Sequence, residues 1–264
     1  MKKANKMGTY EQIIHVTKYA RYLEEKKRRE SWEETITRFM DYMSIKVDLD
    51  GKYKELHKAL VNQEIVPSMR LLMTAGEACE RDNIAAFNCA YTSISSKRVF
   101  SEILYILMNG TGIGFSNERK KIDLLPPVPR ELSWSDDVIV VADSKKGWAV
   151  AFRKLMSSLW EGDIPNVDYS KIRPAGARLK TFGGRASGPL PLQNLFTFVT
   201  ETFKAAQGRK LNSLEVHDII CMIGDIVVVG GVRRSALIGL SNLTDHRMRD
   251  AKTGQWYLPV QDGG

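Results

Sequence analysis

The stretch RPAGARLKTFGGRASGP, residues 173–189, decides how the rest of the sequence is interpreted. It holds four glycines, two prolines and four cations, and it contains no acidic residue. Glycine lets a backbone turn tightly and bring its N–H groups close to a ligand, and neighbouring cations favour an anion. Pro189 or Pro191 suits the first turn of the apolar helix that the sequence predicts next, which would present free N–H groups to the same anion. This composition fits a phosphate site, above all that of a nucleotide, and it also fits a polar surface loop.

A second stretch of the same kind favours the nucleotide interpretation. Residues 230–235 read GGVRRS and again follow a segment with helical apolar spacing. Two loops of glycine and arginine, each placed beside a predicted helix, suit the recognition of anionic groups by backbone donors and guanidinium groups.

The charge of the chain is unevenly distributed. The 264 residues carry a formal net charge of +8, and the first 30 contain nine Lys/Arg and four Glu, which leaves +3 for the remainder. The cations at positions 26–29 are expected to form a solvated helix end. Because no continuous basic stripe with interleaved aromatic residues follows, a nucleic-acid partner is not favoured. A basic nucleic-acid binder remains one alternative.

Cysteine and histidine usage argues against a disulfide framework and a metal centre. The three cysteines have no CxxC spacing, and the four histidines show no metal-ligand spacing. No apolar run approaches the roughly 18 residues of a membrane span, and no apolar block of a signal peptide is present. We therefore expect a cytoplasmic protein with free thiols. Cys221 is expected to pack in a helical core, whereas Cys79 and Cys89 lie in irregular stretches that are more open to chemistry.

The spacing of apolar residues predicts helices that alternate with short strands. A capping box, Ser31 with Glu34, begins one of the helices, and Asn212 or Ser213 caps another. The best candidate for a buried strand is 138–142, and a further strand is expected at 236–240. This alternation indicates an α/β protein with a mostly parallel sheet. The predicted helices cover residues 10–23, 32–43, 53–61, 99–108, 147–160, 192–206 and the segment around 216–223.

Residues 110–114, Gly-Thr-Gly-Ile-Gly, follow a predicted helix. A dinucleotide-binding fingerprint needs its glycines after a strand and before a helix, so this turn is better suited to a close approach between backbone and ligand. About 20 residues earlier lies Cys89. A thiol beside a bound nucleotide suggests redox chemistry, because thiol–disulfide exchange moves two electrons. The alternative is that Cys89 is a small buried apolar residue.

Taken in order, these stretches resemble the ribonucleotide reductases, specifically the adenosylcobalamin-dependent class II enzymes. Short matches are PSMR at 67–70, FNC at 87–89 and GTGIGFS at 110–116. The longer matches, RPAGARLKTFGGRASGPLPL from residue 173 and GGVRRSA at 230–236, are the specific ones. The class I form of the same chemistry, with its radical supplied by a separate metal subunit, is an alternative.

The resemblance implies a fold and a reaction. The fold is the first half of a ten-stranded α/β barrel over residues 65–264, preceded by a small helical region over residues 1–64. The family reduces the 2′ carbon of the ribose in ribonucleoside di- or triphosphates by thiyl-radical chemistry, with cysteine thiols as the reductant. The cofactors implied are adenosylcobalamin, an effector nucleotide and an external dithiol such as thioredoxin.

The resemblance also assigns roles to individual residues. Cys89 matches the first reducing thiol, Ser68 a hydroxyl that contacts the substrate phosphate, and Asn88 a position beside the ribose. Gly112 and Gly114 belong to a turn that lines the substrate pocket. The implied specificity loop consists of Gly230, Gly231, Val232, Arg233, Arg234 and Ser235. The implied effector and substrate neighbourhood consists of Arg173, Arg178, Lys180, Gly183, Gly184 and Arg185.

Several parts of the family pattern are expected beyond residue 264, namely the radical cysteine, the second reducing cysteine and a C-terminal thiol pair. We therefore expect this chain to need the remaining C-terminal half of the catalytic chain and to turn over no nucleotide alone. A nucleotide sensor without enzymatic activity, which keeps the effector loops, is a further alternative.

Overall fold

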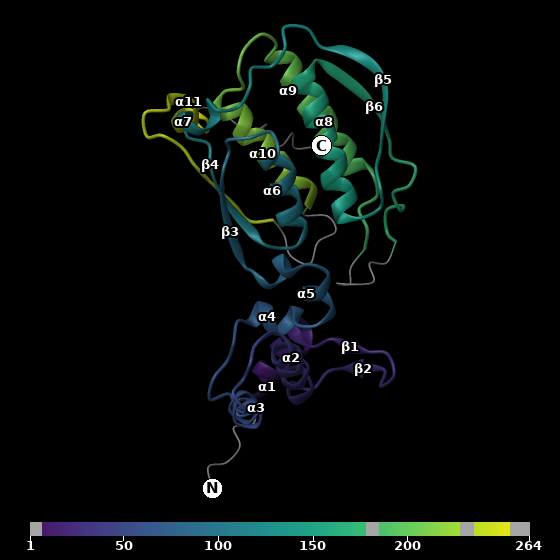
Figure 1. The fold of residues 1–264 in the computed structure, drawn as a ribbon, viewed down its shortest axis with the longest axis vertical. Coiled ribbons are helices and arrows are strands. Elements are labelled where there is room, and N and C mark those ends of the chain that lie inside the picture. Colours follow the sequence, from purple (N-terminus) through teal and green to yellow (C-terminus); the bar gives the residue numbers. More distant parts are fainter. Residues whose placement is uncertain (1–6, 178–184, 228–234, 254–264) are drawn as a thin grey trace, which may run out of the picture. The chain divides into compact units, whose positions relative to one another are not determined.

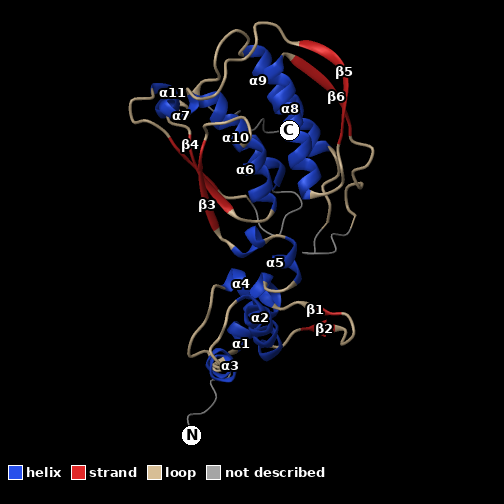
Figure 2. Ribbon diagram, in the orientation of Figure 1, coloured by secondary structure: helices blue, strands red, loops and turns tan. Residues whose placement is uncertain are grey.

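The computed structural model describes residues 7–177, 185–227 and 235–253 (Figure 1). Contacts divide the chain into two compact units, Met1–Asn88 and Cys89–Gly264. Figure 2 shows that the first unit is mostly helical, whereas the second combines helices with strands.

In the first unit, α2 (Trp32–Lys46) packs on α3 (Tyr53–Val61) and α4 (Met69–Thr74). The predicted capping box is confirmed, because Ser31 Oγ accepts from Glu34 N–H and Glu34 Oε2 accepts from Ser31 N–H. The core lies between the three helices and contains Ile36, Met40 and Leu72. Two short elements, α5 (Glu77–Arg81) and the 3-10 helix Asn83–Ala86, complete this unit.

The prediction of one helix over residues 10–23 is wrong. The segment forms α1 (Thr9–Ile14), continues as a π-helix at His15–Tyr19, and then enters the hairpin of β1 (Tyr22–Leu23) and β2 (Arg28–Arg29). Arg21 explains the change, because its guanidinium donates to the Thr74 and Ala75 carbonyls while its own carbonyl accepts from Glu30 N–H. Its backbone is therefore held extended.

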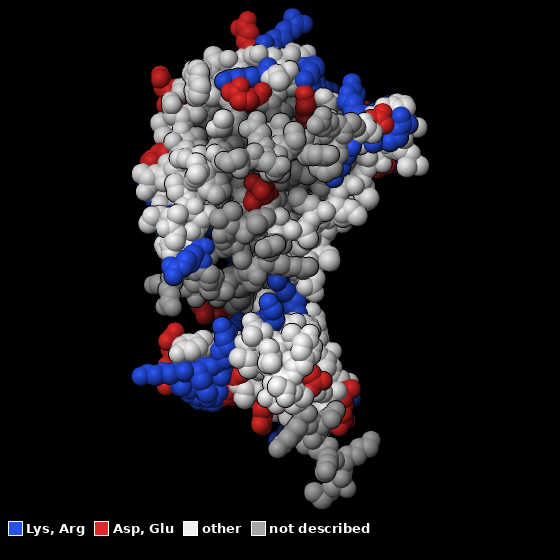
Figure 3. All heavy atoms as spheres, turned by 180° about the vertical axis from the view of Figure 1, so that it is seen from behind, with Lys and Arg blue, Asp and Glu red and all other residues white. Residues whose placement is uncertain are grey.

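The cations at 26–29 lie on this hairpin and not at a helix end. Figure 3 shows Lys and Arg side chains gathered there. Lys26 and Arg28 both pair with Glu34, at 2.6 and 2.7 Å, and Arg29 donates to the Ala20 carbonyl. Part of the positive charge of the N-terminal region is thus neutralised locally.

The second unit is layered (Figure 1). A three-stranded parallel sheet of β3 (Cys89–Ser93), β4 (Gly112–Ser116) and β7 (Leu237–Leu240) packs on α6 (Val99–Met108) and α10 (Ser213–Val227). These helices pack in turn on α8 (Lys145–Glu161) and α9 (Leu190–Ala205). Beyond α8 lies the parallel pair β5 (Ser133–Val140) and β6 (Asp163–Asp168). Two short helices, α7 (Arg119–Ile122) and α11 (His246–Asp250), lie against one end of α10.

The core of this unit is aromatic and aliphatic. Phe152 of α8 stacks on Phe196 of α9 with ring centroids 5.8 Å apart, and Trp160 meets Phe203 edge to face at 4.9 Å. Both pairs join the same two helices, so the α8–α9 contact is fixed along much of its length.

The expected α/β class with parallel strands is confirmed. Two local predictions are wrong. Residues 138–140 of the predicted strand 138–142 belong to β5, which ends at Val140, and the strand is not buried as a whole. Val138 and Val140 are exposed, because one face of the β5–β6 pair is open and alternate residues point to it. The glycines from Gly112 onward are not a turn but the strand β4; only Gly110, with φ of +79°, turns the chain out of α6. The ten-stranded barrel remains an expectation, since the largest sheet of the described residues has three strands.

Leu155 and Val150 on α8 provide a test of this core. Leu155 is 2% exposed and Val150 is 44% exposed. We expect Leu155→Ala to lower the free energy of unfolding by about 2–5 kcal/mol, because it leaves a cavity between packed helices. Val150→Ala should change it by less than about 0.5 kcal/mol. Urea denaturation followed by tryptophan fluorescence measures both, and equal effects would contradict the packing described.

Candidate active site on the open face of the parallel sheet

The register of the parallel sheet brings three predicted segments together. Cys89 lies opposite Gly112, and Ile113 lies opposite Leu237. Ile113 N–H donates to the Ala236 carbonyl at 2.9 Å, which ties the start of β7 to the start of β4. The segment that contains Ser235 therefore reaches the sheet at the level of Gly112 and Cys89, at the start of the three strands.

The two faces of this sheet differ. Ile113 and Phe115, 2% and 1% exposed, point into the core beneath α6 and α10. Alternation along the strands places Cys89 and Tyr91 on the opposite face. We call this surface the open face, and it comprises Cys89, Tyr91, Gly112, Gly114 and Ile238, of which Gly112 is buried and Gly114 half-buried. Cys89 is exposed there, and Tyr91 and Ile238 are each 63% exposed.

Gly114 forms the floor between two larger side chains on the open face. A Cβ atom at Gly114 would lie 3.3 Å from Ile238 Cγ2 and 3.5 Å from Tyr91 Cδ2. The Tyr91 and Ile238 side chains therefore come close together over Gly114, and a residue larger than glycine would press on both. Glycine in a strand interior is common where a ligand or another chain comes close to the main chain.

Ser68 and Asn88 are both exposed and belong to the first unit. Ser68 occupies the N-cap position of α4 without a side-chain capping bond, so its hydroxyl is not used to begin the helix. Their placement beside a substrate stays a prediction.

The two ends of the central loop, residues 173–177 and 185–189, are joined by backbone pairing. Gly176 N–H donates to the Ala186 carbonyl, and Ala186 N–H donates to the Ala177 carbonyl. Arg185 donates to the Gly176 carbonyl at 3.0 Å. Gly188 has a φ of +74°, and a Cβ there would lie 3.0 Å from Ala175 N, so the close approach of the two ends requires glycine.

Not every cation of the loop is available to an anion. Arg173 pairs with Asp143 at 2.7 Å, just after β5. The loop leads into α9, which has proline in its first turn, as predicted. The remaining predicted residues of the two loops lie outside the described residues: Arg178, Lys180, Gly183, Gly184, Gly230, Gly231, Val232, Arg233 and Arg234.

Two cysteine predictions are wrong. Cys79 is buried on α5, where its thiol donates to Thr74 Oγ1 at 3.3 Å. Cys221 is exposed on α10, with His217 one turn before it. His217 and Asp218 are neighbours on this helix, and their side chains meet with Nδ1 and Oδ1 3.0 Å apart. The spacing of four between His217 and Cys221 is the sequence signal that could have identified this cluster.

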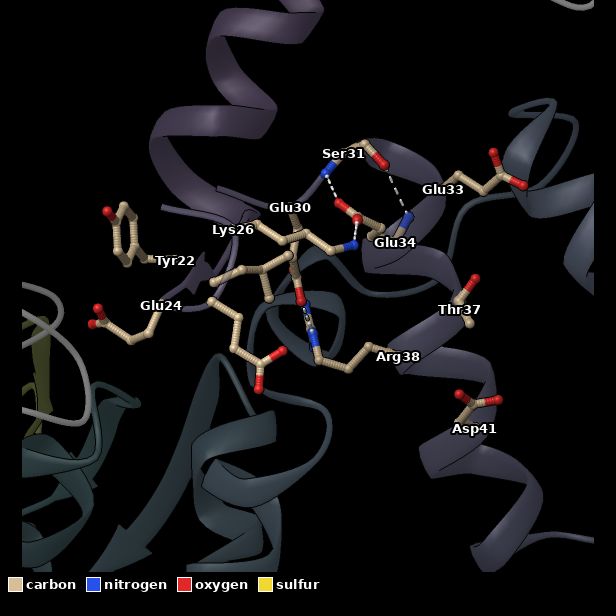
Figure 4. Close-up of a pocket in the computed structure, with 12 residues that line it drawn as sticks. Tyr22, Glu24, Lys26, Glu30, Ser31, Glu33, Glu34, Thr37, Arg38 and Asp41 are labelled. Atoms are coloured by element: carbon tan, nitrogen blue, oxygen red, sulfur yellow. Dashed lines mark hydrogen bonds and ion pairs between the residues drawn. The ribbon is translucent and has the colours of Figure 1, made fainter. Parts of the chain in front are cut away.

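A groove in the first unit was not predicted. It has a volume of about 980 Å³ and lies between the β1–β2 hairpin and α2 (Figure 4). Glu30 and Arg38 face each other at 2.7 Å along its wall. Burial alone would raise the pKa of Glu30, but hydrogen bonds from Arg38, from Arg21 N–H and from Thr35 together lower it. The groove contains none of the predicted site residues, and its ion pairs hold the hairpin to the helix.

Over the described ranges, no three His, Cys, Asp or Glu side chains are grouped so as to hold a metal ion. No helix within the same residues is both long enough and apolar enough to cross a membrane.

Comparisons with known proteins agree with the resemblance. Residues 131–203 match the model of the insertion domain of B12-dependent ribonucleotide reductase. The match includes α8, β6, the central loop and most of α9.

Adenosylcobalamin-dependent ribonucleoside-triphosphate reductases are similar over most of the chain. The protein of Lactobacillus delbrueckii subsp. bulgaricus is 28% identical over 312 residues, which cover 92% of this chain and 42% of that protein. A putative reductase of Mycobacterium phage D29 is 29% identical and covers 82% of this chain and 38% of the phage protein. This chain thus spans about two fifths of the length of these relatives.

A solved structure of a B12-dependent class II ribonucleotide reductase superposes with a TM-score of 0.79 and 24% identity. It covers 92% of this chain, while 43% of the solved chain is matched. The fold of the two proteins is therefore shared. Together, these comparisons confirm the resemblance to adenosylcobalamin-dependent ribonucleotide reductases.

The Glu30–Arg38 pair predicts a pH-dependent stability. The lowered pKa of Glu30 means that the pair stabilises the fold at neutral pH and that this contribution is lost as the pH falls below about 4. We expect Glu30→Gln to cost about 3–5 kcal/mol at pH 7, because Arg38 is left unpaired, and less at lower pH. Urea denaturation at a series of pH values measures the difference. If the free energy of unfolding of Glu30→Gln differed from that of the wild type by the same amount down to pH 3, the result would contradict this role.

Thiol accessibility tests the placement of the cysteines. A chromogenic disulfide reagent should modify Cys89 and Cys221 rapidly in the native chain, and Cys79 only after denaturation, since Cys79 is buried. Cys89→Ser and Cys221→Ser should each remove one fast-reacting thiol. Cys79→Ser is the matched control and should leave the fast phase unchanged; a reduced fast phase in this variant would show that α5 is misplaced.

Proposed function

We propose that this chain is the N-terminal half of the catalytic chain of an adenosylcobalamin-dependent ribonucleotide reductase. The observation that carries the proposal is the register of Cys89 against Gly112 on the open face. The thiol is exposed and lies opposite a glycine, and in our proposal the ribose lies against it. The relatives named as ribonucleoside-triphosphate reductases supply the substrate class.

Cys89 serves as the first of two reducing thiols in this proposal. Two thiols become one disulfide and release two electrons and two protons; the ribose 2′-hydroxyl leaves as water and a hydrogen takes its place. The second thiol comes from the remaining half of the catalytic chain, because Cys79 is buried in the other unit and Cys221 lies on the helix side of the sheet. An external dithiol then restores Cys89.

The residues of the open face position the substrate and exclude water from it. In this proposal the sugar lies beside the exposed side chains of Tyr91 and Ile238, whose apolar surface excludes water, and Gly112 and Gly114 add no side chain that would obstruct it. Ser68 and Asn88 would contact the phosphate and the ribose. Adenosylcobalamin, when bound, supplies the radical that starts the reaction. Among the described residues of the open face, Cys89 and Tyr91 carry the thiol and the hydroxyl, and we place no contact to cobalamin on them.

Ser235 supports a link between an effector nucleotide and this site. It ends the stretch 230–235 and is followed by Ala236, whose carbonyl accepts from Ile113 N–H on β4. An effector held by residues 230–235, together with Arg185 of the central loop, would act on the strand that carries Gly112 and Gly114. We propose this route for the choice of the substrate base.

Gly114→Val tests the site directly. The added side chain fills the strip between Tyr91 and Ile238, so we expect ribonucleoside triphosphate affinity to fall by at least about tenfold, which is 1.4 kcal/mol. Equilibrium dialysis with labelled nucleotide measures it. Cys89→Ser should leave the affinity within about twofold while it abolishes reduction in the completed enzyme.

Thr92→Val is the matched control, because Thr92 lies in the same sheet with its side chain on the other face. It should bind like the wild type. Wild-type affinity in Gly114→Val, or no binding by the wild-type chain, would contradict the proposed site.

A further inference from the structure

A second cysteine site lies on α10, away from the open face. Cys221 Sγ is 3.5 Å from Nε2 and 3.7 Å from Nδ1 of His217. On the other side of the ring, Nδ1 is 3.0 Å from Asp218 Oδ1. An imidazole placed between a thiol and a carboxylate is the arrangement that activates nucleophilic cysteines.

Packing holds the imidazole in place. The His217 ring lies against Phe115 with centroids 6.1 Å apart, and its Cδ2 lies 3.3 Å from the position a Cβ would take at Gly239. Both contacts come from the helix-covered face of β4 and β7. The ring is thus wedged against the sheet on one side while the Cys221 thiol remains exposed to solvent.

This packing separates Cys221 from the proposed active site. Phe115 points to the helix-covered face of β4, and Cys89 lies on the open face of the neighbouring strand. Cys221 and Cys89 therefore lie on opposite sides of one sheet, and Cys221 is free for chemistry of its own.

The electrostatics of the cluster favour a charged pair. The hydrogen bond with Cys221 raises the pKa of His217 most strongly, burial opposes it, and Asp218 raises it further, to about 9 in total. Because this value exceeds the usual 6.5, the ring stays protonated through neutral pH and loses its proton only as the pH rises through about 9. The groups that act on the ring are the Cys221 side chain, through a hydrogen bond, and the Asp218 carboxylate.

We propose that Cys221 is a modification site, a nucleophilic thiol activated by His217 that forms mixed disulfides with low-molecular-weight disulfides of the glutathione type. Cys221 gives its proton to water, the protonated His217 ring stabilises the resulting thiolate, and Cys221 Sγ attacks one sulfur of the disulfide. A new S–S bond forms as the old one breaks, and the second half leaves as a thiolate that is protonated by His217 or water. The low-molecular-weight disulfide is the oxidant, and an excess of free thiol reverses the step.

Asp218 is a positioning residue in this cluster. Its carboxylate accepts from Nδ1 and directs Nε2 to the sulfur. Loss of its charge should lower the reactivity of Cys221 less than loss of the imidazole does. The proposal does not rest on the reductase function, because it involves neither the open face nor a bound nucleotide.

The test is the rate of alkylation of each cysteine in the intact 264-residue chain, followed by peptide mass spectrometry after timed exposure to iodoacetamide at pH 7. Cys89, which is also exposed and has no imidazole beside it among the described residues, is the internal standard. We expect Cys221 to react at least about tenfold faster than Cys89. His217→Gln should bring Cys221 close to the rate of Cys89 without changing that standard, and Asp218→Asn should give an intermediate rate.

Glutathione disulfide is the second probe, and it should add one glutathionyl group to the peptide of Cys221 before that of Cys89. Thermal unfolding followed by tryptophan fluorescence shows whether the His217→Gln chain remains folded. If this variant is unfolded, the Asp218→Asn variant and the pH profile of the wild-type alkylation rate serve as the test instead. A wild-type profile that stays high from pH 6 to pH 8 supports the thiolate–imidazolium pair. Equal rates for Cys221 and Cys89, or an unchanged Cys221 rate in a folded His217→Gln chain, would overturn the proposal.

Discussion

The parallel pairing of β3, β4 and β7 is the constraint on which the rest of the second unit depends. Parallel strands need crossover connections, and here the crossovers carry α6 between β3 and β4 and the longer run of α8, α9 and α10 between β4 and β7. The described helices α6 and α10 cover the face that holds Ile113 and Phe115. A parallel sheet is usually covered on both sides, so the face left open is the natural place for a ligand or for further chain.

Strand β4 shows how function and stability are balanced in this sheet. Glycine in a strand interior costs roughly 0.5–1 kcal/mol relative to alanine, and β4 contains Gly112 and Gly114. Its alternate residues Ile113 and Phe115 are almost fully buried, and their burial offsets that cost, since each large apolar side chain contributes about 1.5–3 kcal/mol. The same strand can therefore be anchored on one face and bare on the other.

Much of this fold could be predicted from the sequence, because long apolar helices and their caps are local features. Ser31, Asn212 and the proline of α9 mark helix starts correctly. The errors arise where contacts between residues far apart in the sequence determine the local structure. Arg21 ends a helical pattern by bonding to carbonyls more than 50 residues away, and Gly112 is extended because β3 and β7 pair with its strand. The pairing of Cys89 with Gly112 could not be derived from periodicity; the motifs only suggested that they share a site.

The two exposed thiols of this chain suit different tasks because their surroundings differ. A thiol that exchanges electrons with a bound sugar must be accessible from one side and must not be consumed by stray oxidants, so an apolar setting without a neighbouring imidazole is suitable. Cys89 has this setting, between a glycine strip and Tyr91. A thiol that responds to solutes in solution needs a neighbouring cation that stabilises its thiolate, and the protonated His217 ring provides this for Cys221. The sheet separates the two, so that modification of one does not block the other sterically.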